Sequence, residues 1–391
     1  MTNRERENAT LNFQKPDRGA VEETFYPWVL TTQRYKGEGL PADLCDGARD
    51  ITNDLAGNKA NQTEKYFPEA WGEGVMAYEQ HLGFDPVRRI HFVLPFRRFE
   101  EKLLEETPDY TIKQDIFGRQ MIHKTGSTLD LVHKPTVTCA EDWEALKAHA
   151  DKELETYFTE EAMTAAYAHL KEGHDRGEYP IWLTLSGGFW FPRDLFGIEN
   201  HLFSFFDYPE LYHRILEDLA EYQIRLLERV YEVLSPDFMT FAEDMSYNKG
   251  PMISEELFNT FLEPYYRKVI PVLHSHGTKV IMDSDGDISR MIPWMQRVGI
   301  DGVLPLERQA GVDVCALREQ YPDFLFIGAY DKMAMRRGTA DMRSEFERLL
   351  PAMRSGGFVP SCDHQTPPDV PLERYREYVA MLHDYARRAV K

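Results

Sequence analysis

Short apolar runs recur along this chain from residue 90 onward, and most of them are followed by a stretch with helical character. They are too short and too uniformly apolar to be amphipathic helices, which indicates strands buried on both faces. The expected strands are Ile90–Leu94, Ile181–Leu185, Phe238–Ala242, Lys279–Met282, Gly302–Leu306, Phe324–Gly328 and Gly357–Pro360. The expected helices between them are Pro209–Leu234, Ser254–His274, Ile288–Arg297, Cys315–Gln320 and Met342–Met353.

Alternation of strands and helices predicts a parallel sheet. A doubly wound sheet would normally offer a glycine-rich phosphate turn, and Ser186-Gly187-Gly188-Phe189 lacks the third glycine of that fingerprint. We therefore expect an α/β fold of the (β/α)8 TIM-barrel type, which also fits a chain of 391 residues. We expect residues 1–85 to form an N-terminal extension packed on the barrel and residues 86–391 to form the barrel itself. One strand is not found cleanly, and Tyr110–Pro135 is predicted to be an inserted hairpin.

The charge balance narrows the classes of partner. The chain has 65 Asp and Glu against 45 Lys and Arg, a formal net charge of −20. This excess repels phosphate backbones and anionic lipids, so we expect neither nucleic acid nor a membrane as partner. No apolar run approaches the roughly 18–20 residues that span a bilayer. The N-terminus is too charged for a signal peptide, and the four cysteines form no CxxC pair, so a cytoplasmic protein is expected.

Polar side chains follow five of the predicted strands at the point where each strand ends. In chain order they are Glu243 and Asp244; Asp283, Asp285 and Asp287; Glu307; Tyr330 and Asp331; and Cys362, Asp363 and His364. Barrel enzymes place their catalytic groups at the carboxyl ends of the strands, so we expect these side chains to meet at one mouth.

Each of these acids also has a structural interpretation, because a single acid after a strand often caps the next helix. We expect capping or turn roles for Asp287, Asp331 and Asp313. For the adjacent pair Glu243 and Asp244 both interpretations stay open.

Asp283 and Asp285 stand two residues apart, so their side chains are expected to point the same way. Carboxylates that close either share a proton or bind a cation. Together with the imidazole of His364 and the thiol of Cys362 they suit a divalent metal, and equally metal-free acid–base chemistry.

Several motifs together resemble the uroporphyrinogen decarboxylase superfamily. They are Arg4-Glu5-Arg6, Lys15-Pro16-Asp17-Arg18, Gly250-Pro251-Met252-Ile253-Ser254, Glu263-Pro264-Tyr265, Asp283-Ser284-Asp285-Gly286-Asp287, Leu304-Pro305-Leu306-Glu307, Ile327-Gly328, Gly356-Gly357-Phe358 and Asp363-His364. That superfamily contains decarboxylases of haem biosynthesis and zinc-dependent methyltransferases that serve corrinoid proteins, and its fold is a (β/α)8 barrel.

The chain departs from both branches of the superfamily. The decarboxylases carry an arginine-rich segment that grips substrate carboxylates, whereas this chain reads Tyr26-Pro27-Trp28-Val29-Leu30-Thr31-Thr32-Gln33-Arg34. The methyltransferases hold zinc with a His-x-Cys pair and a later Cys; here Asp283 and Asp285 replace the pair, and Cys362 stands near the third position. The resemblance implies a divalent metal, zinc above all, held by a substitute set of Asp283, Asp285, Glu307, Cys362 and His364.

The leading hypothesis is a methyltransferase that passes a methyl group between a small methylated substrate and a thiol or a corrinoid carried by a partner protein. Glu243, Asp244 and Asp285 are the catalytic candidates, and Trp28, Arg34 and Tyr330 the candidates for substrate contact. The alternative is a metal-free decarboxylase or related lyase, with Arg18, Arg34, Arg97 and Arg98 as carboxylate grips. A third hypothesis is a ligand-binding barrel without catalysis. The resemblance also favours a homodimer.

Overall fold

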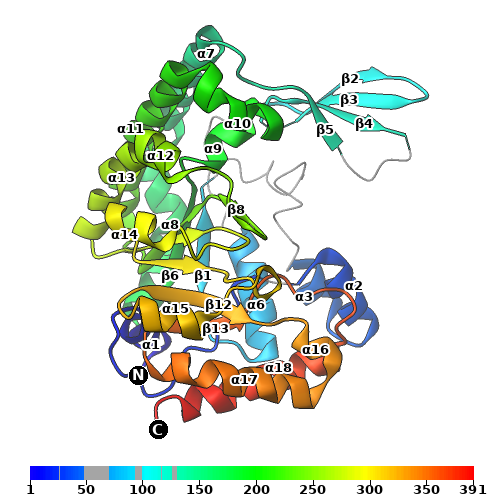
Figure 1. Ribbon diagram of the computed structural model, residues 1–391, viewed down its shortest axis with the longest axis vertical. Coiled ribbons are helices and arrows are strands. Elements are labelled where there is room, and N and C mark those ends of the chain that lie inside the picture. The colour runs from blue at the N-terminus through cyan, green and yellow to red at the C-terminus, as the bar shows by residue number, and fades with distance from the viewer. Residues whose placement is uncertain (26, 48–69, 93–98, 116, 126–129) are drawn as a thin grey trace.

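The centre of the molecule is a sheet of seven parallel strands (Figure 1). This computed structural model describes residues 1–25, 27–47, 70–92, 99–115, 117–125 and 130–391. The strands are β1 (Arg88–His91), β6 (Ile181–Ser186), β7 (Phe238–Ala242), β10 (Lys279–Asp283), β11 (Gly302–Leu304), β12 (Leu325–Tyr330) and β13 (Phe358–Cys362). Each pairs with the strand next along the chain, β1-β6-β7-β10-β11-β12-β13, which confirms the predicted α/β fold of barrel type.

The strands are buried on both faces, as their uniformly apolar sequences predict. One face of the sheet turns toward an inner apolar cluster to which almost every strand contributes. This cluster contains Trp182, Phe238, Ile281, Leu304, Leu325, Ile327 and Val359, together with Leu11, Ala20 and Val87 from outside the strands. The sheet therefore curls around a packed interior.

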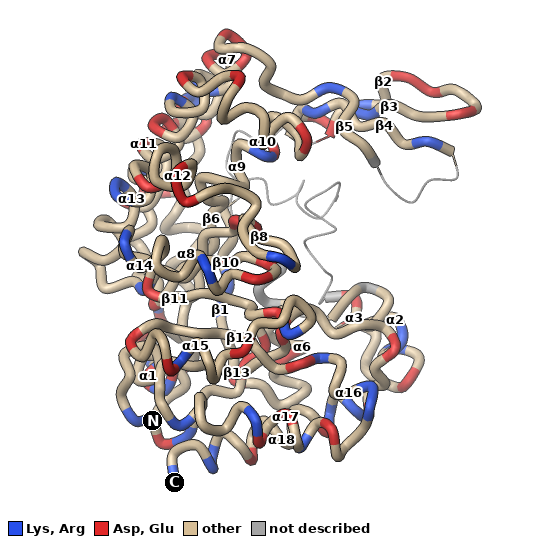
Figure 2. The backbone as a smooth tube through the Cα atoms, in the orientation of Figure 1, with Lys and Arg blue, Asp and Glu red and all other residues tan. Residues whose placement is uncertain are grey.

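Helices cover the outer face of the sheet (Figure 1). Those of the barrel are α7 (Ala140–Tyr157), α8 (Glu160–Asp175), α9 (Trp190–Phe196), α10 (Ile198–Asp207), α11 (Pro209–Val233), α12 (Glu255–Leu257), α13 (Glu263–Ser275), α14 (Ile292–Val298), α15 (Val314–Gln320), α16 (Ala334–Arg337), α17 (Thr339–Arg354) and α18 (Leu372–Arg388). Acidic and basic positions are interspersed along these helices in Figure 2.

Two of the predicted helices differ from the structure in a way that the sequence explains. The predicted helix Ser254–His274 divides into α12, a π-helical turn at Phe258–Leu262 and α13, whose first turn contains Pro264. The predicted helix Ile288–Arg297 begins only at Ile292, with a proline next to it. Among the described residues, no helix is both long and apolar enough to cross a membrane.

The residues before β1 form α1 (Asn3–Leu11), α2 (Val29–Gly37), α3 (Ala42–Gly47) and α6 (Ala70–Leu82). An extended segment at residues 20–25 lies between β13 and β1. There the backbone N–H of Cys362 donates to Glu23 Oε1 at 2.9 Å, and Arg89 Nη2 donates to the Glu23 carbonyl at 2.5 Å. The side chains of Thr24 and Ser361 are also hydrogen-bonded. This N-terminal segment thus occupies the gap between the first and last strands of the sheet.

The segment expected to be an inserted hairpin is larger than predicted. Four strands form an antiparallel sheet here: β2 (Lys102–Glu106), β3 (Tyr110–Gln114), β4 (Gln120–Lys124) and β5 (Asp130–Lys134). It projects from one end of the molecule, away from the chain termini (Figure 1). The prediction missed its first strand, whose described side chains are all exposed and which therefore lacks an apolar run.

Glu23 makes the stability of the fold depend on pH. Its side chain is only 1% exposed, and burial raises the pKa of its carboxyl to about 8. The unfolded chain ionises this group near its ordinary value of 4.5. As pH rises from about 4.5 to about 8, the native state retains a proton that the unfolded state releases, so native stability falls.

We expect Glu23→Gln to remove part of that fall, roughly a few kcal/mol, because the amide keeps the acceptor for Cys362 and cannot ionise. Urea unfolding of both proteins across this pH range measures it. Glu221→Gln, on an exposed position of α11, is the control and should follow the parent. An equal loss of stability in Glu23→Gln and the parent would contradict this assignment.

Candidate functional site

The loop after β10 brings the predicted acidic residues together. Gly286 adopts a left-handed φ of +78° and lies against the backbone of Tyr247, so a side chain there would collide with that backbone. The N–H of Gly286 donates to Glu307 Oε2 at 2.8 Å, which joins the ends of β10 and β11. The Ser284 hydroxyl accepts a hydrogen bond from the N–H of Met245, which joins β10 to the end of β7.

Two groups of side chains at these strand ends have the spacing of metal ligands. One consists of Asp285, Glu307 and His364, and the other of Asp244, Asp283 and Asp285. Within each group the potential ligand atoms lie within 4.8 Å of one another, and Asp285 belongs to both. We call these the histidine group and the aspartate group. The two groups contain five different residues, all of which the sequence analysis selected as metal or catalytic candidates at four strand ends, and the fold brings them to one mouth.

Burial, followed by mutual repulsion, raises the pKa values of two members of the aspartate group. Burial and the neighbouring charge of Asp285 raise the pKa of Asp244 to about 6, against the opposing effect of Arg193. Burial, with Asp244 and Asp285 nearby, raises the pKa of Asp283 well above its ordinary value. Such a group gains stability from a bound cation or from a retained proton.

His364 joins the two groups electrostatically. Its Nε2 lies 3.5 Å from Asp285 Oδ2. Burial alone would lower the pKa of His364, but the hydrogen bond and the negative charge of Asp285 outweigh burial and raise it. The imidazole is therefore held where it can serve either as a cationic partner of Asp285 or, when neutral, as a ligand.

Aromatic rings from the N-terminal segment lie against His364. The centroid of its ring is 5.0 Å from that of Phe25 and 6.2 Å from that of Trp28. The predicted contact residue Trp28 thus lies beside the histidine group. An apolar wall next to polar ligand atoms is typical of a small-molecule site.

Two cations that the sequence analysis did not select lie at the edges of the acidic groups. Arg193 Nη2 lies 3.5 Å from Asp244 Oδ2, and its guanidinium stacks 3.8 Å from the centroid of Trp190. Lys332 Nζ lies 3.2 Å from Asp363 Oδ1 and 2.9 Å from Gln309 Oε1. Lys332 follows a predicted strand end and could have been found there. Arg193 lies inside a helix, where sequence position alone carries no signal.

Glu243, a predicted catalytic residue, has a different environment. Its side chain is fully buried and accepts hydrogen bonds from the N–H groups of Phe189 at 2.8 Å and Trp190 at 3.0 Å, and one from the Tyr266 hydroxyl. Burial raises its pKa to about 7. Glu243 thus caps the first turn of α9 across the end of β6, so these contacts support a positioning role for it.

Three other predicted residues lie outside the two groups. Cys362 is fully buried, and its Sγ lies 3.8 Å from the Thr366 hydroxyl. Tyr330 is also fully buried, with its ring against Phe346 and Tyr378. Both residues belong to strands, and their side chains point into the hydrophobic core. The alternation of side chains along a strand could not predict this direction from the sequence. Their packing does not bring Cys362 to the metal candidates or Tyr330 to the mouth.

Two of the four arginines expected to bind a substrate carboxylate lie in the described residues, and both are paired with acidic side chains. Arg34 forms an ion pair with Glu38 at 2.6 Å, and Arg18 forms two hydrogen bonds to Asp85 at 2.6 and 2.8 Å. Arg97 and Arg98 lie outside the described residues.

The acids assigned to turns and caps behave largely as predicted. Asp313 caps α15 by accepting from Cys315, and Asp331 accepts from the N–H of Met333 in the turn before α16. Asp287 accepts from the N–H of Ser289. It makes a turn there and does not cap the following helix, since α14 begins only at Ile292.

Parallel strands in sequential order, with polar side chains gathered at their carboxyl ends, form the arrangement that barrel enzymes use for their catalytic groups. The family model for uroporphyrinogen decarboxylase (URO-D) matches residues 95–385, about three quarters of the chain. The protein therefore belongs to the uroporphyrinogen decarboxylase family, whose members are generally enzymes.

Other comparisons are more distant. No curated protein matches the sequence significantly. Among solved structures, a xylose isomerase domain protein from Planctomyces limnophilus is 11% identical. The match covers 59% of this chain and 85% of that chain, with a TM-score of 0.34, which is too low to bear on function.

The contacts of Glu243 predict a severe effect of a small change in the loop after β6. A Cβ at Gly187 would overlap the Glu243 carboxylate, so Gly187→Ala must displace a buried, hydrogen-bonded acid. We expect a loss of roughly 2–4 kcal/mol in the free energy of unfolding. Gly37→Ala, where nothing lies within 4 Å of the new methyl group, should change it by less than about 1 kcal/mol. Similar unfolding midpoints for the two variants would contradict the packing described for Glu243.

Proposed function

We propose that this protein is a metal-dependent methyltransferase of the uroporphyrinogen decarboxylase family, with the metal held by the histidine group. The observation that carries the proposal is the convergence of Asp285, Glu307 and His364, with ligand atoms within 4.8 Å, at one mouth of the barrel. Two carboxylates and one imidazole are a donor set that divalent ions accept, zinc and harder ions included. A bound divalent ion would supply Lewis acidity toward the heteroatom of a small methylated substrate.

The chain's own residues supply the surroundings of that reaction. Phe25 and Trp28 form an apolar wall beside His364, which suits a methyl group and limits water there. Gly286 orients Glu307 through its N–H, and Asp285 orients His364. Asp244 and Asp283 of the aspartate group hold protons more tightly than ordinary carboxyls, which suits them to protonate a leaving heteroatom. The methyl acceptor is a corrinoid on a partner protein or a thiol, as the superfamily resemblance implies.

A carboxy-lyase acting on a small carboxylated substrate is the second candidate. Lys332 and Arg193 favour it, because a substrate carboxylate at the mouth could replace Asp363 and Asp244 as the partner of these cations. The carboxyls of the aspartate group would then protonate the carbon that loses carbon dioxide.

Metal content tests the donor set. We expect about one divalent ion per chain after incubation with zinc or manganese and removal of loose metal. Asp285→Asn, Glu307→Gln and His364→Gln should each lower the affinity more than about tenfold, since each removes a ligand. Asp283→Asn should keep the ion, because Asp283 belongs only to the aspartate group.

Asp287→Asn is the matched control, since it lies in the same loop and the amide oxygen keeps its hydrogen bond to Ser289. It should bind metal like the parent protein. Full occupancy in Asp285→Asn and His364→Gln, or no bound ion in the parent with either metal, would contradict the proposed site.

Reaction assays separate the two candidate functions. We expect transfer of a methyl group from a methylated amine, ether or thioether to reduced cobalamin, followed by the absorbance of methylcobalamin. Uroporphyrinogen should not be converted to coproporphyrinogen, because the described arginines expected to bind its carboxylates are paired with Asp85 and Glu38. Formation of coproporphyrinogen would overturn methyl transfer in favour of decarboxylation.

A further inference from the structure

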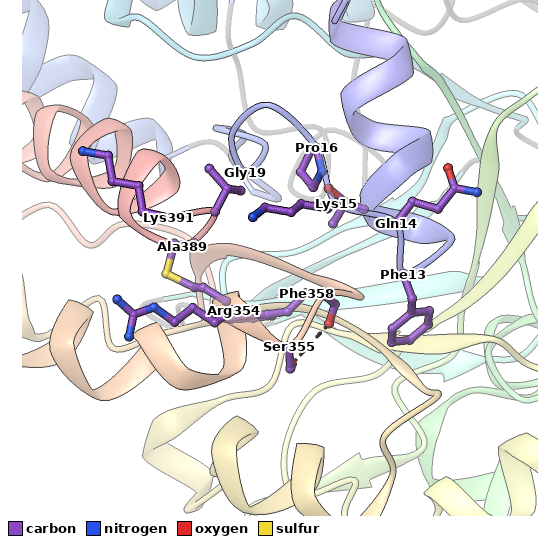
Figure 3. A pocket seen from close by; sticks show the side chains of 14 residues that line it. Phe13, Gln14, Lys15, Pro16, Gly19, Arg354, Ser355, Phe358, Ala389 and Lys391 are labelled. Atoms are coloured by element: carbon purple, nitrogen blue, oxygen red, sulfur yellow. Dashed lines mark hydrogen bonds between the residues drawn. The ribbon is translucent and has the colours of Figure 1, made fainter.

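A pocket lies at the opposite end of the sheet from the acidic groups. It has a volume of about 350 Å³ and lies where the loop after α1, the turn before β13 and the C-terminal residues meet (Figure 3). Phe358, the first residue of β13, lines it, whereas His364 comes after the last residue of that strand. We call it the basal pocket.

The charge of the basal pocket is the reverse of that of the whole protein. Lys15, Arg354 and Lys391 line it, and none of its lining side chains is acidic, although the chain carries a net charge of −20. Lys391 is the last residue here, so its α-carboxylate balances its ammonium group, and the positive charge of the pocket comes from Lys15 and Arg354. These three cations have no ion-pair partner among the residues that the structure describes. The acid nearest to Lys15 in the sequence is Asp17, which already forms ion pairs with Arg6 at 2.9 Å and with the N-terminal amine at 3.0 Å. Unpaired cations that converge at a concave surface attract an anion.

The other walls of the pocket combine apolar side chains with the polar side chains of Thr10, Gln14 and Ser355. Phe13, Phe358 and Met353 line it together with smaller side chains, and Figure 3 shows Phe13 at the end away from Arg354 and Lys391. Phe13 adopts a left-handed φ of 55°, and its ring lies over the guanidinium of the buried Arg318, 5.3 Å from the ring centroid. The apolar end is therefore formed before any ligand arrives, which reduces the ordering that binding requires.

We propose that the basal pocket binds a small molecule with an anionic head group, a phosphate or a carboxylate, attached to an apolar body. Lys15 and Arg354 bind the head group, and Phe13 and Phe358 contact the body. The size of the pocket suits a metabolite of about one ring, because small-molecule sites usually span roughly 300–1,000 Å³. The site is independent of the proposed metal and of the reaction at the barrel mouth.

Isothermal titration with phenyl phosphate, benzoate and inorganic phosphate tests the proposal. We expect saturable binding of phenyl phosphate or benzoate with one site per chain. The probe that binds tighter identifies the head group, and inorganic phosphate should bind at least about tenfold more weakly because it lacks the apolar body. No saturable binding of either aromatic probe in the millimolar range, or equal binding of inorganic phosphate, would overturn the proposal.

Two variants locate the binding. Lys15→Glu combined with Arg354→Glu should weaken the better probe more than about tenfold, since each loses a charged contact. The matched control combines Lys113→Glu on β3 with Lys152→Glu on α7; both are exposed, and the change in net charge is the same. This control should bind like the parent, and an equal loss of affinity in it would show a general charge effect and overturn the pocket assignment.

The second variant is Ala389→Trp, which fills the pocket without altering its charge and should abolish binding of the aromatic probes. Circular dichroism confirms that each variant is folded before titration. Unchanged binding in a folded Ala389→Trp protein would place the ligand elsewhere and overturn the proposal.

Discussion

Three carboxylates, those of Asp244, Asp283 and Asp285, lie within 4.8 Å of one another at the ends of two neighbouring strands, and their repulsion must be offset for the site to exist. The chain offsets part of it with Arg193 on one side and His364 on the other, and with protons held by the carboxyls themselves. A divalent cation held by the histidine group would lie beside Asp285, the residue that both groups share, and would reduce the remainder. This is why we infer a cation site next to these three carboxylates and not an incidental accumulation of charge.

The scaffold around the cluster holds it in place through contacts between successive strand ends. Gly286 connects β10 to Glu307 after β11, and Ser284 connects it to Met245 after β7. Farther along the sheet, the buried carboxylate of Asp363 accepts from the N–H groups of Arg308 and Lys332 and so ties the ends of β11, β12 and β13 together. Many polar atoms at the mouth thus hold the loops in place, while the side chains of the histidine and aspartate groups keep the spacing of metal ligands.

The N-terminal segment is a second constraint on the site. It enters the gap between β13 and β1, where Glu23 binds the backbone of Cys362 and the side chain of Arg89, and it ends with Phe25 against His364. The N-terminal segment therefore contributes both to the inner apolar cluster, through Leu11 and Ala20, and to the aromatic side of the mouth, through Phe25.

The strands and the gathering of acids at their ends were predictable, because buried parallel strands leave a clear apolar signal and barrel topology determines where they end. What the sequence could not decide is the direction of each side chain. Cys362 and Tyr330 stand at strand ends like Asp283, yet their side chains point into the core. The sequence could not predict this, because the alternation of side chains along a strand does not indicate which of the two faces the last residue belongs to. The place of Glu243 directly after β7 made it a catalytic candidate. The fold shows that its carboxylate instead accepts hydrogen bonds from the start of α9, across the end of the neighbouring strand β6. The exposed strand β2 and the partners of Arg193 left no sequence pattern.

The central claim is that oxygen and imidazole nitrogen, and no thiolate, hold a divalent ion at this mouth. X-ray absorption at the metal edge of the zinc-loaded protein measures it directly. We predict a first shell of nitrogen and oxygen alone, at about 2.0–2.2 Å, with an imidazole contribution that is lost in His364→Gln. A sulfur scatterer at about 2.3 Å would place the buried Cys362 among the ligands and contradict the account.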